Sequence, residues 1–346
     1  MKPLVSILIP AFNAEAWIAD TLRSAVAQTW ERKEIIVVDD GSADRTAVIA
    51  RSFERDGVRV FTQTNAGAAA ARNEAYRRSH GDYIQWLDAD DLLAPDKIAL
   101  QMHARGPRTL LSSEWGEFLY RCDHASFVPT ELWCNLTPLE WLVRKLAYNR
   151  HMQTATWLVS RELTDAAGQW DTSLLGDDDG EYFCRVLMAS DGVLFVPGAK
   201  VYYRASGNTS LSYIGISERK IRAHWHSMRL HINSILSLED SEMVRAACVR
   251  YLNNWLIHFY PEYPEIVDEA GCLAASLGGH LETPPLSWKY MWIKALLGWG
   301  AAKRCQMTAR SVRWSVQRSW DRALFHVESS KSFRTPQSVT EGIRNS

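Results

Sequence analysis

Three acidic side chains close a run of apolar residues in the segment YIQWLDADDLLAPD, residues 83–96. Ionised carboxylates at Asp88, Asp90 and Asp91 repel one another, so folding alone gives little reason to place them together. Carboxylate oxygens are the ligands that Mg²⁺ and Mn²⁺ prefer, and such a cation can also bind phosphate oxygens. The segment therefore predicts a divalent-cation site at Asp90 and Asp88. The alternative is a helix cap, at Asp90 or Asp91, for the helix expected around APDKIALQM.

Aspartates form two further clusters that could do chemistry. Asp39 and Asp40 follow the apolar run EIIVV, where an ionised carboxylate can accept hydrogen bonds from a nucleobase N–H or a ribose hydroxyl. Asp-Gly-Ser is also an ordinary turn sequence. The second cluster, GDDDGEYF, places residues 177–179 just before an expected helix. Burial near a diphosphate would raise the pKa of one of these carboxyls and make it a general base, whereas the alternative is a solvated acidic turn.

The first hundred residues alternate between two hydrophobic periodicities. Short apolar runs predict strands over 4–9, 34–40, 58–63 and 82–87. Helical spacing lies between them, over 14–29, 41–55 with Ser42 as N-cap, and 65–80. This order predicts right-handed βαβ units, hence an α/β fold with a mostly parallel sheet flanked by helices. Ligands bind at the carboxyl ends of such strands, where the first two acidic clusters stand.

Composition and missing motifs exclude several classes of protein. The formal net charge of −1 gives no reason to expect nucleic acid as a partner, and 23% charged residues are ordinary for a globular chain. The sequence has no G-x-G-x-x-G after the first strand and no P-loop, which excludes a dinucleotide fold and a P-loop NTPase. A nucleotidyltransferase would show a glycine-rich basic loop at that same place. Six cysteines without a C-x-x-C pair are typical of a reduced, cytoplasmic protein.

Three blocks of this sequence, in this order, resemble the family-two inverting glycosyltransferases, which have the GT-A fold. They are VSILIPAFN…EIIVVDDGSADRT, NAGAAAARNEAYRRSHGDYIQWLDADD and GQWDTSLLGDDDGEYFCRVLMASDGVLFVPGAKVYYR. The likeness covers residues 3–212. It implies transfer of a sugar from a nucleotide diphosphate sugar, UDP-sugar by default, to a hydroxyl of a glycan or lipid-linked acceptor. The alternative is an inactive module that only binds a nucleotide sugar or a partner.

The resemblance also implies roles for individual residues. The nucleotide sugar would be bound by Pro10, Phe12, Asn13, Asp39, Asp40, Arg72, Asp88 and Ala89, with Asp40 ahead of Asp39 as the contact to base or ribose. Asp90 would be the direct ligand of Mn²⁺ or Mg²⁺, with Asp88 beside it. The family's Glu-Asp pair falls on Asp178 and Asp179, which makes Asp179 the catalytic base and Asp177 its substitute if the register slips.

Two departures from the family pattern stand out. Asp178 occupies a position where Glu is usual, so the side chain that carries the carboxylate is shorter by one methylene group. A histidine often follows the segment YYR, but here the run is ASGNTSLS, in which Asn208 or Ser206 would have to replace it. The expected division is a nucleotide-sugar half (1–110), an acceptor half carrying the base (111–212), a helical region (213–327) and a polar, disordered tail (328–346).

The helical region has an unusual stretch at residues 286–325. It holds eight Lys or Arg residues against one acidic residue, together with five tryptophans. Such a segment could lie flat on an anionic bilayer, which would place the protein peripherally on the inner face of the membrane. The alternative is an ordinary helical pair packed on the catalytic domain. No apolar stretch has the length of a spanning helix.

Overall fold

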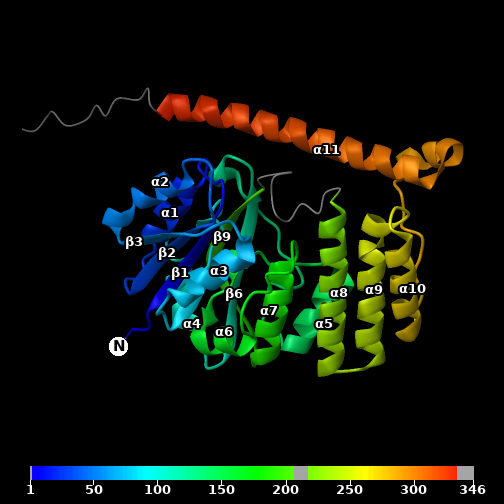
Figure 1. Cartoon of the computed structure of the whole chain (residues 1–346), viewed down its shortest axis with the longest axis horizontal. Helices are drawn as coiled ribbons and strands as arrows, with labels where there is room; N and C mark the ends of the chain where they lie inside the picture. The colour runs from blue at the N-terminus through cyan, green and yellow to red at the C-terminus, as the bar shows by residue number, and fades with distance from the viewer. Residues whose placement is uncertain (1, 206–216, 333–346) are drawn as a thin grey trace, which may run out of the picture. The chain divides into compact units, whose positions relative to one another are not determined.

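The predicted strands form the parallel part of a central sheet in the computed structural model, which describes residues 2–205 and 217–332 (Figure 1). Its strands are β1 (Val5–Ala11), β2 (Lys33–Asp39), β3 (Val58–Thr62), β4 (Tyr83–Trp86) and β8 (Val159–Ser160). The order is β3-β2-β1-β4-β8, in which only β8 is antiparallel to its neighbour. All seven residues of β1 are buried, which explains the continuous apolar run there.

Helices α1 (Ile18–Val26), α2 (Thr46–Arg51) and α3 (Ala68–Arg77) connect these strands, so the predicted α/β architecture is confirmed. The predicted N-cap at Ser42 is wrong. Helix α2 begins only at Thr46, and Asp44 Oδ1 accepts from the Thr46 backbone N–H at 2.9 Å. The Ser42 hydroxyl instead accepts from the backbone N–H of Asn13 at 2.9 Å. Ser42 therefore joins the loops after β1 and β2 at the carboxyl edge of the sheet.

A second sheet lies in the region where the sequence is least regular. Its order is β5-β9-β6-β7, formed by β5 (Leu92–Leu93), β9 (Gly192–Arg204), β6 (Thr109–Phe118) and β7 (Ser126–Phe127). The helices of this region are α4 (Lys97–Ala104), α5 (Pro138–Tyr148), α6 (Arg161–Ala167) and α7 (Asp178–Ala189). Strand β5 follows the D-x-D segment directly and pairs with the end of β9 at Leu92 and Tyr202, so this sheet braces the predicted metal site.

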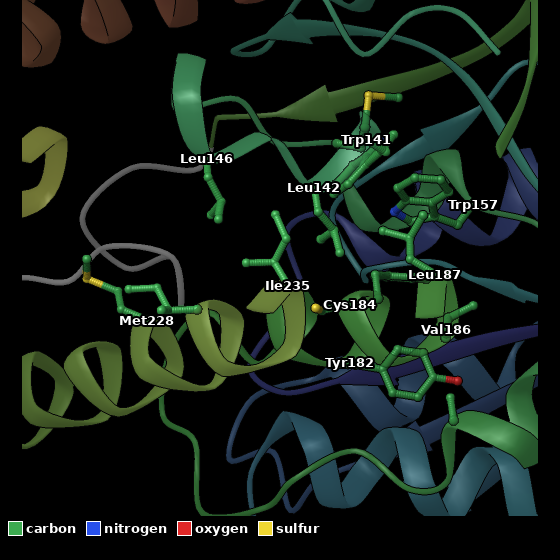
Figure 2. Close-up of a cluster of buried hydrophobic side chains, with 14 of the residues drawn as sticks. Trp141, Leu142, Leu146, Trp157, Tyr182, Cys184, Val186, Leu187, Met228 and Ile235 are labelled. Atoms are coloured by element: carbon green, nitrogen blue, oxygen red, sulfur yellow. The ribbon is translucent and has the colours of Figure 1, made fainter. Parts of the chain in front are cut away.

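Three long helices follow: α8 (Glu218–Leu238), α9 (Glu242–Phe259) and α10 (Pro264–Ser276). Figure 1 shows them standing side by side. Their inner residues belong to one apolar cluster with α5 and α7, in which Met228 and Ile235 of α8 join Leu142 of α5 and Leu187 of α7 (Figure 2). Because α7 begins at the acidic turn, this core fixes α8 behind that turn.

The chain divides into two compact units. The first comprises Met1–Glu117 and Ser126–Pro285, and the second comprises Phe118–Ala125 with the chain from Leu286 onward. The expected helical region 213–327 is thus split, since α8–α10 belong to the first unit and α11 (Met291–Ser332) to the second. The predicted tail starts too early. Helix α11 continues to Ser332, and Glu328 pairs with Arg121 of the same unit at 2.9 Å.

Candidate active site

Arg72 is the centre of the site. Its guanidinium donates from Nη2 to Asp88 Oδ1 at 2.8 Å and from Nη1 to Asp178 Oδ2 at 2.7 Å. The side chain is only 6% exposed and lies over the ring of Trp170, 4.4 Å from the ring centre. Asn73, the next residue of α3, fixes the Trp170 backbone through both of its amide atoms. Arg72 thus joins the D-x-D segment at the end of β4 to the acidic turn at the start of α7. These are the two segments that the sequence predicts to share one site.

The D-x-D loop is held rigidly by its surroundings. Thr21 Oγ1 donates to the carbonyl of Ala89 at 2.9 Å, and Arg204 Nε donates to the carbonyl of Asp90 at 2.9 Å. Asp88 and Asp90 are both partly exposed at the end of β4. The two predicted ligand positions therefore sit on a fixed backbone, which favours a binding site over a mobile surface turn.

Asp91 has a structural role. It is fully buried, and its carboxylate accepts from the Arg204 backbone N–H at 2.8 Å and from the side-chain amide of Gln153. Burial raises the pKa of Asp91 well above its usual value, and the charges of Asp90 and Asp88 add to this. The predicted cap at Asp90 or Asp91 is wrong, because α4 begins at Lys97 and its N-cap is Asp96.

The residues at the D-x-D loop fit a divalent cation in one particular mode. Among the residues that the structure describes, no three His, Cys, Asp or Glu side chains form a metal-binding group. One carboxylate oxygen of Asp88 is already bound by Arg72. The chain could therefore supply one or two carboxylates, Asp90 first, with the remaining ligands coming from phosphate oxygens and water. Mg²⁺ is commonly bound in this way in nucleotide sites.

Asp177 holds the acidic turn in place from behind. Its backbone is left-handed, with a φ of 56°, and its carboxylate accepts from Ser227 Oγ of α8 at 2.7 Å. His231 Nδ1 of α8 lies 3.7 Å away. Burial acts to raise the pKa of Asp177, but His231 and Lys145 outweigh it and hold this pKa below its usual value. These partners make Asp177 a poor substitute for the catalytic base.

Asp179 is the carboxyl in this turn with a pKa near neutrality. Burial raises its pKa to about 7, and the charges of Asp178 and Asp177 act in the same direction. The contact to its Oδ2 from Thr154 Oγ1 is long, at 3.4 Å. Asp178 has a raised pKa for the same reason, although its ion pair with Arg72 opposes the shift. A carboxyl that gains and loses a proton near pH 7 is suited to general acid–base catalysis.

The two aspartates after β2 differ in their environment. Asp40, the preferred nucleotide contact in the sequence, uses its carboxylate to hold the loop before α3. It accepts from Gln63 Nε2 at 2.7 Å and from the backbone N–H groups of Ala66 and Gly67 at 2.9 and 2.8 Å. Asp39 accepts from the Ser42 N–H through Oδ2 at 3.2 Å, while its buried Oδ1 has no hydrogen-bond partner within the described residues. That oxygen is the better acceptor for a ligand.

The other predicted nucleotide contacts lie on the loop after β1. Pro10 is buried within the strand, and Phe12 is 51% exposed. Asn13 has a positive φ of 48°, and its side-chain Oδ1 accepts from the backbone N–H of Ala43 at 2.9 Å. The loop therefore presents an aromatic ring to solvent beside Asp39 and its neighbours. The substitutes for the family histidine, Asn208 and Ser206, lie outside the described residues.

Sequence reasoning missed several residues of the site, namely Trp170, Gln153, Thr154, Arg204, Ser227 and His231. The sequence did contain a signal for Trp170 and Arg204, because both lie in the third of the three blocks that resemble the family, the one that begins GQWDTSLL. Ser227 and His231 belong to a helix about fifty residues after the acidic turn, and nothing in their local sequence indicates that contact.

Comparisons with known proteins identify the family that this chain resembles and the fold that it shares. Residues 6–104 match the family described as Glycosyl transferase family 2. An uncharacterised glycosyltransferase of Haemophilus influenzae is 40% identical over 104 residues, which are 29% of this chain and 42% of that protein. The chain spans half or less of the length of the first curated relatives it matches.

Two solved structures share the fold. The chain aligns with S. aureus TarS 1-349 in complex with UDP-GlcNAc at a TM-score of 0.64 and 18% identity, covering 79% of this chain and 82% of that one. It aligns with the mannosyltransferase PcManGT of Pyrobaculum calidifontis, in complex with GDP-Man and Mn²⁺, at a TM-score of 0.52 and 17% identity, covering 93% and 88%. Residues 6–104 therefore match glycosyl transferase family 2, and the fold of the chain is the expected GT-A type.

Proposed function

We propose that this protein is an inverting glycosyltransferase that moves a sugar from a nucleotide diphosphate donor to an acceptor hydroxyl. The observation that carries the proposal is the meeting of Asp88, Asp178 and Asp179 around Arg72 at the carboxyl end of β4. Within that group, Asp179 has a pKa of about 7 because of burial and its acidic neighbours. The family match and the two nucleotide-sugar complexes of similar fold support the choice of donor class.

The donor would bind along the edge formed by the loops after β1, β2 and β4. Asp39 Oδ1 would accept a hydrogen bond from the base or the ribose, since this buried oxygen otherwise lacks a partner. Phe12 would contact the nucleoside from the exposed side. Asp90, with Asp88, would hold Mn²⁺ or Mg²⁺. When bound, this cation would neutralise negative charge on the departing diphosphate.

Asp179 would act as the general base. It would accept the proton of an acceptor hydroxyl, whose oxygen then bonds to the anomeric carbon as the bond to the diphosphate breaks. Attack opposite to the leaving group inverts the anomeric configuration. Arg72 would keep Asp88 and Asp178 in place during this step, and Thr154 would orient the base. UDP is the first nucleotide to test, because TarS of similar fold was crystallised with UDP and UDP-GlcNAc.

The donor can be identified by thermal denaturation with a panel of nucleotide sugars, each with and without Mn²⁺. A ligand that binds only the folded state raises the melting temperature by mass action, so the correct donor stands out from the panel. Asp90→Ala should remove the part of this stabilisation that depends on metal. Asp96→Ala, at the cap of α4, is a matched control. Unchanged metal dependence in Asp90→Ala would contradict the metal assignment.

Asp179→Asn tests the base. General-base catalysis is worth about 10²–10⁴-fold, so kcat should fall by that factor while donor affinity is retained. Since the folded state raises the pKa of Asp179, ionisation destabilises the fold as pH rises through about 7. Asp179→Asn should therefore melt higher than the parent at pH 8 and lose this advantage in acid. Asp171→Asn, in the exposed turn just before, is the control.

The rival function is a module that binds a nucleotide sugar without transferring it. It predicts donor-dependent stabilisation with no product from any acceptor and no donor hydrolysis. If Asp179→Asn transfers sugar at the parent rate, Asp179 is not the base. If the parent itself neither transfers nor hydrolyses a donor that it binds, the binding module is the correct function.

A further inference from the structure

The second unit exposes large apolar side chains to an unusual degree. Trp288 is 79% exposed, Leu296 75% and Trp320 68%. Most of the exposed large hydrophobic residues of the described chain lie in this unit: Trp288, Met291, Trp292, Leu296, Leu297, Met307, Val312, Val316, Trp320, Phe325 and Val327. Soluble surfaces rarely carry apolar residues at this density, and such patches mark interaction sites.

These residues form an ordered surface along α11, the helix drawn orange to red in Figure 1. The helix is interrupted at Gly298, whose φ of 83° is not helical. After this kink, Val312, Val316 and Trp320 recur at four-residue spacing and Val327 follows seven residues later, which puts them on one face of the helix. We call the residues Trp288, Trp292, Leu296, Val312, Val316 and Trp320 the exposed stripe.

The surface around the stripe is basic. Residues 286–325 hold eight Lys or Arg residues and a single acid, Asp321. Asp321 is bound within the unit, by Arg121 Nε at 2.7 Å and by the Tyr120 backbone N–H at 2.9 Å, and is only 15% exposed. It therefore offers little charge to a partner. Arg304, Arg313 and Arg322 are exposed along the same helix.

We propose that α11 and the turn before it bind the surface of an anionic lipid bilayer through the exposed stripe. Tryptophan and valine side chains would enter the boundary between headgroups and acyl chains, and the flanking Arg and Lys residues would contact the anionic headgroups. Charge decides between a bilayer and a second copy of the chain. Two copies that met through this surface would bring two basic helices together, which repel each other. An anionic bilayer surface instead attracts the basic helix. Among the described residues no helix is long and apolar enough to cross the bilayer, so the contact is peripheral.

The test is flotation of the full chain with vesicles of phosphatidylcholine alone or of phosphatidylcholine with phosphatidylglycerol. We expect binding only to the anionic vesicles, and weaker binding as salt is raised. Each basic residue near such a surface strengthens partitioning about five-fold, so Arg313→Glu with Arg322→Glu should weaken it about thirty-fold or more. Trp292→Ser with Trp320→Ser should also abolish flotation. Circular dichroism spectra confirm that each variant is folded.

Matched controls come from the first unit. Arg55→Glu with Arg250→Glu makes the same change in net charge at exposed positions, and Val48→Ser with Met243→Ser removes two exposed apolar side chains. Both controls should float like the parent. The proposal is overturned if the parent fails to bind anionic vesicles, if it binds neutral vesicles equally, or if the stripe variants and controls behave alike. It is also overturned if the stripe variants abolish a dimer in a parent that does not bind vesicles.

Discussion

Two acidic clusters of this protein hold their anchoring aspartates in opposite electrostatic environments. Each has three aspartates within four positions, at 88–91 and at 177–179. In each, one aspartate is bound by Arg72 and another is locked by neighbouring elements. The locked residues are Asp91, whose pKa is raised by burial, and Asp177, whose pKa is lowered by His231 and Lys145. A run of aspartates therefore does not determine which member is charged; the partners from elsewhere in the fold do.

This comparison suggests a shared division of roles. Asp88 and Asp178 share one arginine, and they bring the two clusters to the same place. Asp91 and Asp177 anchor their loops. The remaining members, Asp90 and Asp179, are those that we assign to the metal and to the proton. Each role predicts a different result when the side chain or its partner is replaced.

Replacing Arg72 should have the largest effect on stability. Arg72→Ala leaves the mostly buried carboxylate of Asp178 and the partly exposed one of Asp88 without their cation, and the loss of a buried ion-pair partner typically costs about 3–5 kcal/mol of unfolding free energy. Arg72→Lys should be intermediate, since an ammonium group cannot bind both carboxylates in the geometry of a guanidinium. Arg77, one turn along α3, is itself 65% exposed in its pair with Glu74, so Arg77→Ala should cost less than about 1 kcal/mol. Urea denaturation measures all three, and equal costs for Arg72 and Arg77 would contradict the shared role.

The two anchoring aspartates should respond to pH in opposite ways. The folded state lowers the pKa of Asp177, so its stabilisation is present above the unfolded pKa and lost as pH falls through the folded value. Asp177→Asn should cost about 1–3 kcal/mol near neutral pH and little in acid. The folded state raises the pKa of Asp91, so the parent loses stability as pH rises. The unfolding free energy of Asp91→Asn, taken relative to the parent, should therefore increase with pH. Denaturation at about pH 2 to 3, below the usual carboxyl pKa, and at about pH 8 distinguishes them, and parallel pH slopes would refute the contrast.

Removing the support behind Asp177 should have a smaller effect. Ser227→Ala deletes the 2.7 Å hydrogen bond from α8 to the acidic turn and should cost about 0.5–1.5 kcal/mol. Because the turn also carries Asp179, kcat should fall several-fold while donor affinity stays unchanged. Ser237→Ala, on the exposed end of the same helix, should change neither quantity. A loss of donor affinity equal to the loss of kcat would show that Ser227 acts on the whole fold instead.

The sequence predicted the parts of this site that depend on local pattern. The apolar runs placed β1, β2 and β4, and their carboxyl ends placed Asp39, Asp88 and Asp90 at one edge of the sheet. Local pattern did not give the exact start of α2. The sequence predicts Ser42 as the N-cap, but the helix begins at Thr46, whose backbone N–H donates to Asp44. The second sheet was missed because the long strand β9 pairs with β5, about a hundred residues earlier.

Assigning roles within each acidic cluster required contacts between distant segments. The sequence offers Asp91 as an alternative cap for the helix that follows it, yet Asp91 accepts from Gln153 and Arg204, which come from later elements. Asp40 was ranked above Asp39 as a nucleotide contact, but it holds the loop before α3. Partners that lie 26 and 27 residues from Asp40, and 62 and 113 residues from Asp91, leave no periodic signal in the sequence, so composition and spacing could not have distinguished these neighbours.

The pH dependence of kcat/KM, measured for the parent and for Asp178→Asn with the identified donor, tests the central claim most directly. Since Asp179 must be ionised to accept a proton, the parent rate should rise with pH, with a midpoint near its pKa of about 7. Asparagine at 178 keeps an acceptor for Arg72 but removes the charge that raises the pKa of Asp179, so the midpoint should move to lower pH. A profile that is flat across this range, or a midpoint that does not move in Asp178→Asn, would contradict the assignment of Asp179 as the base.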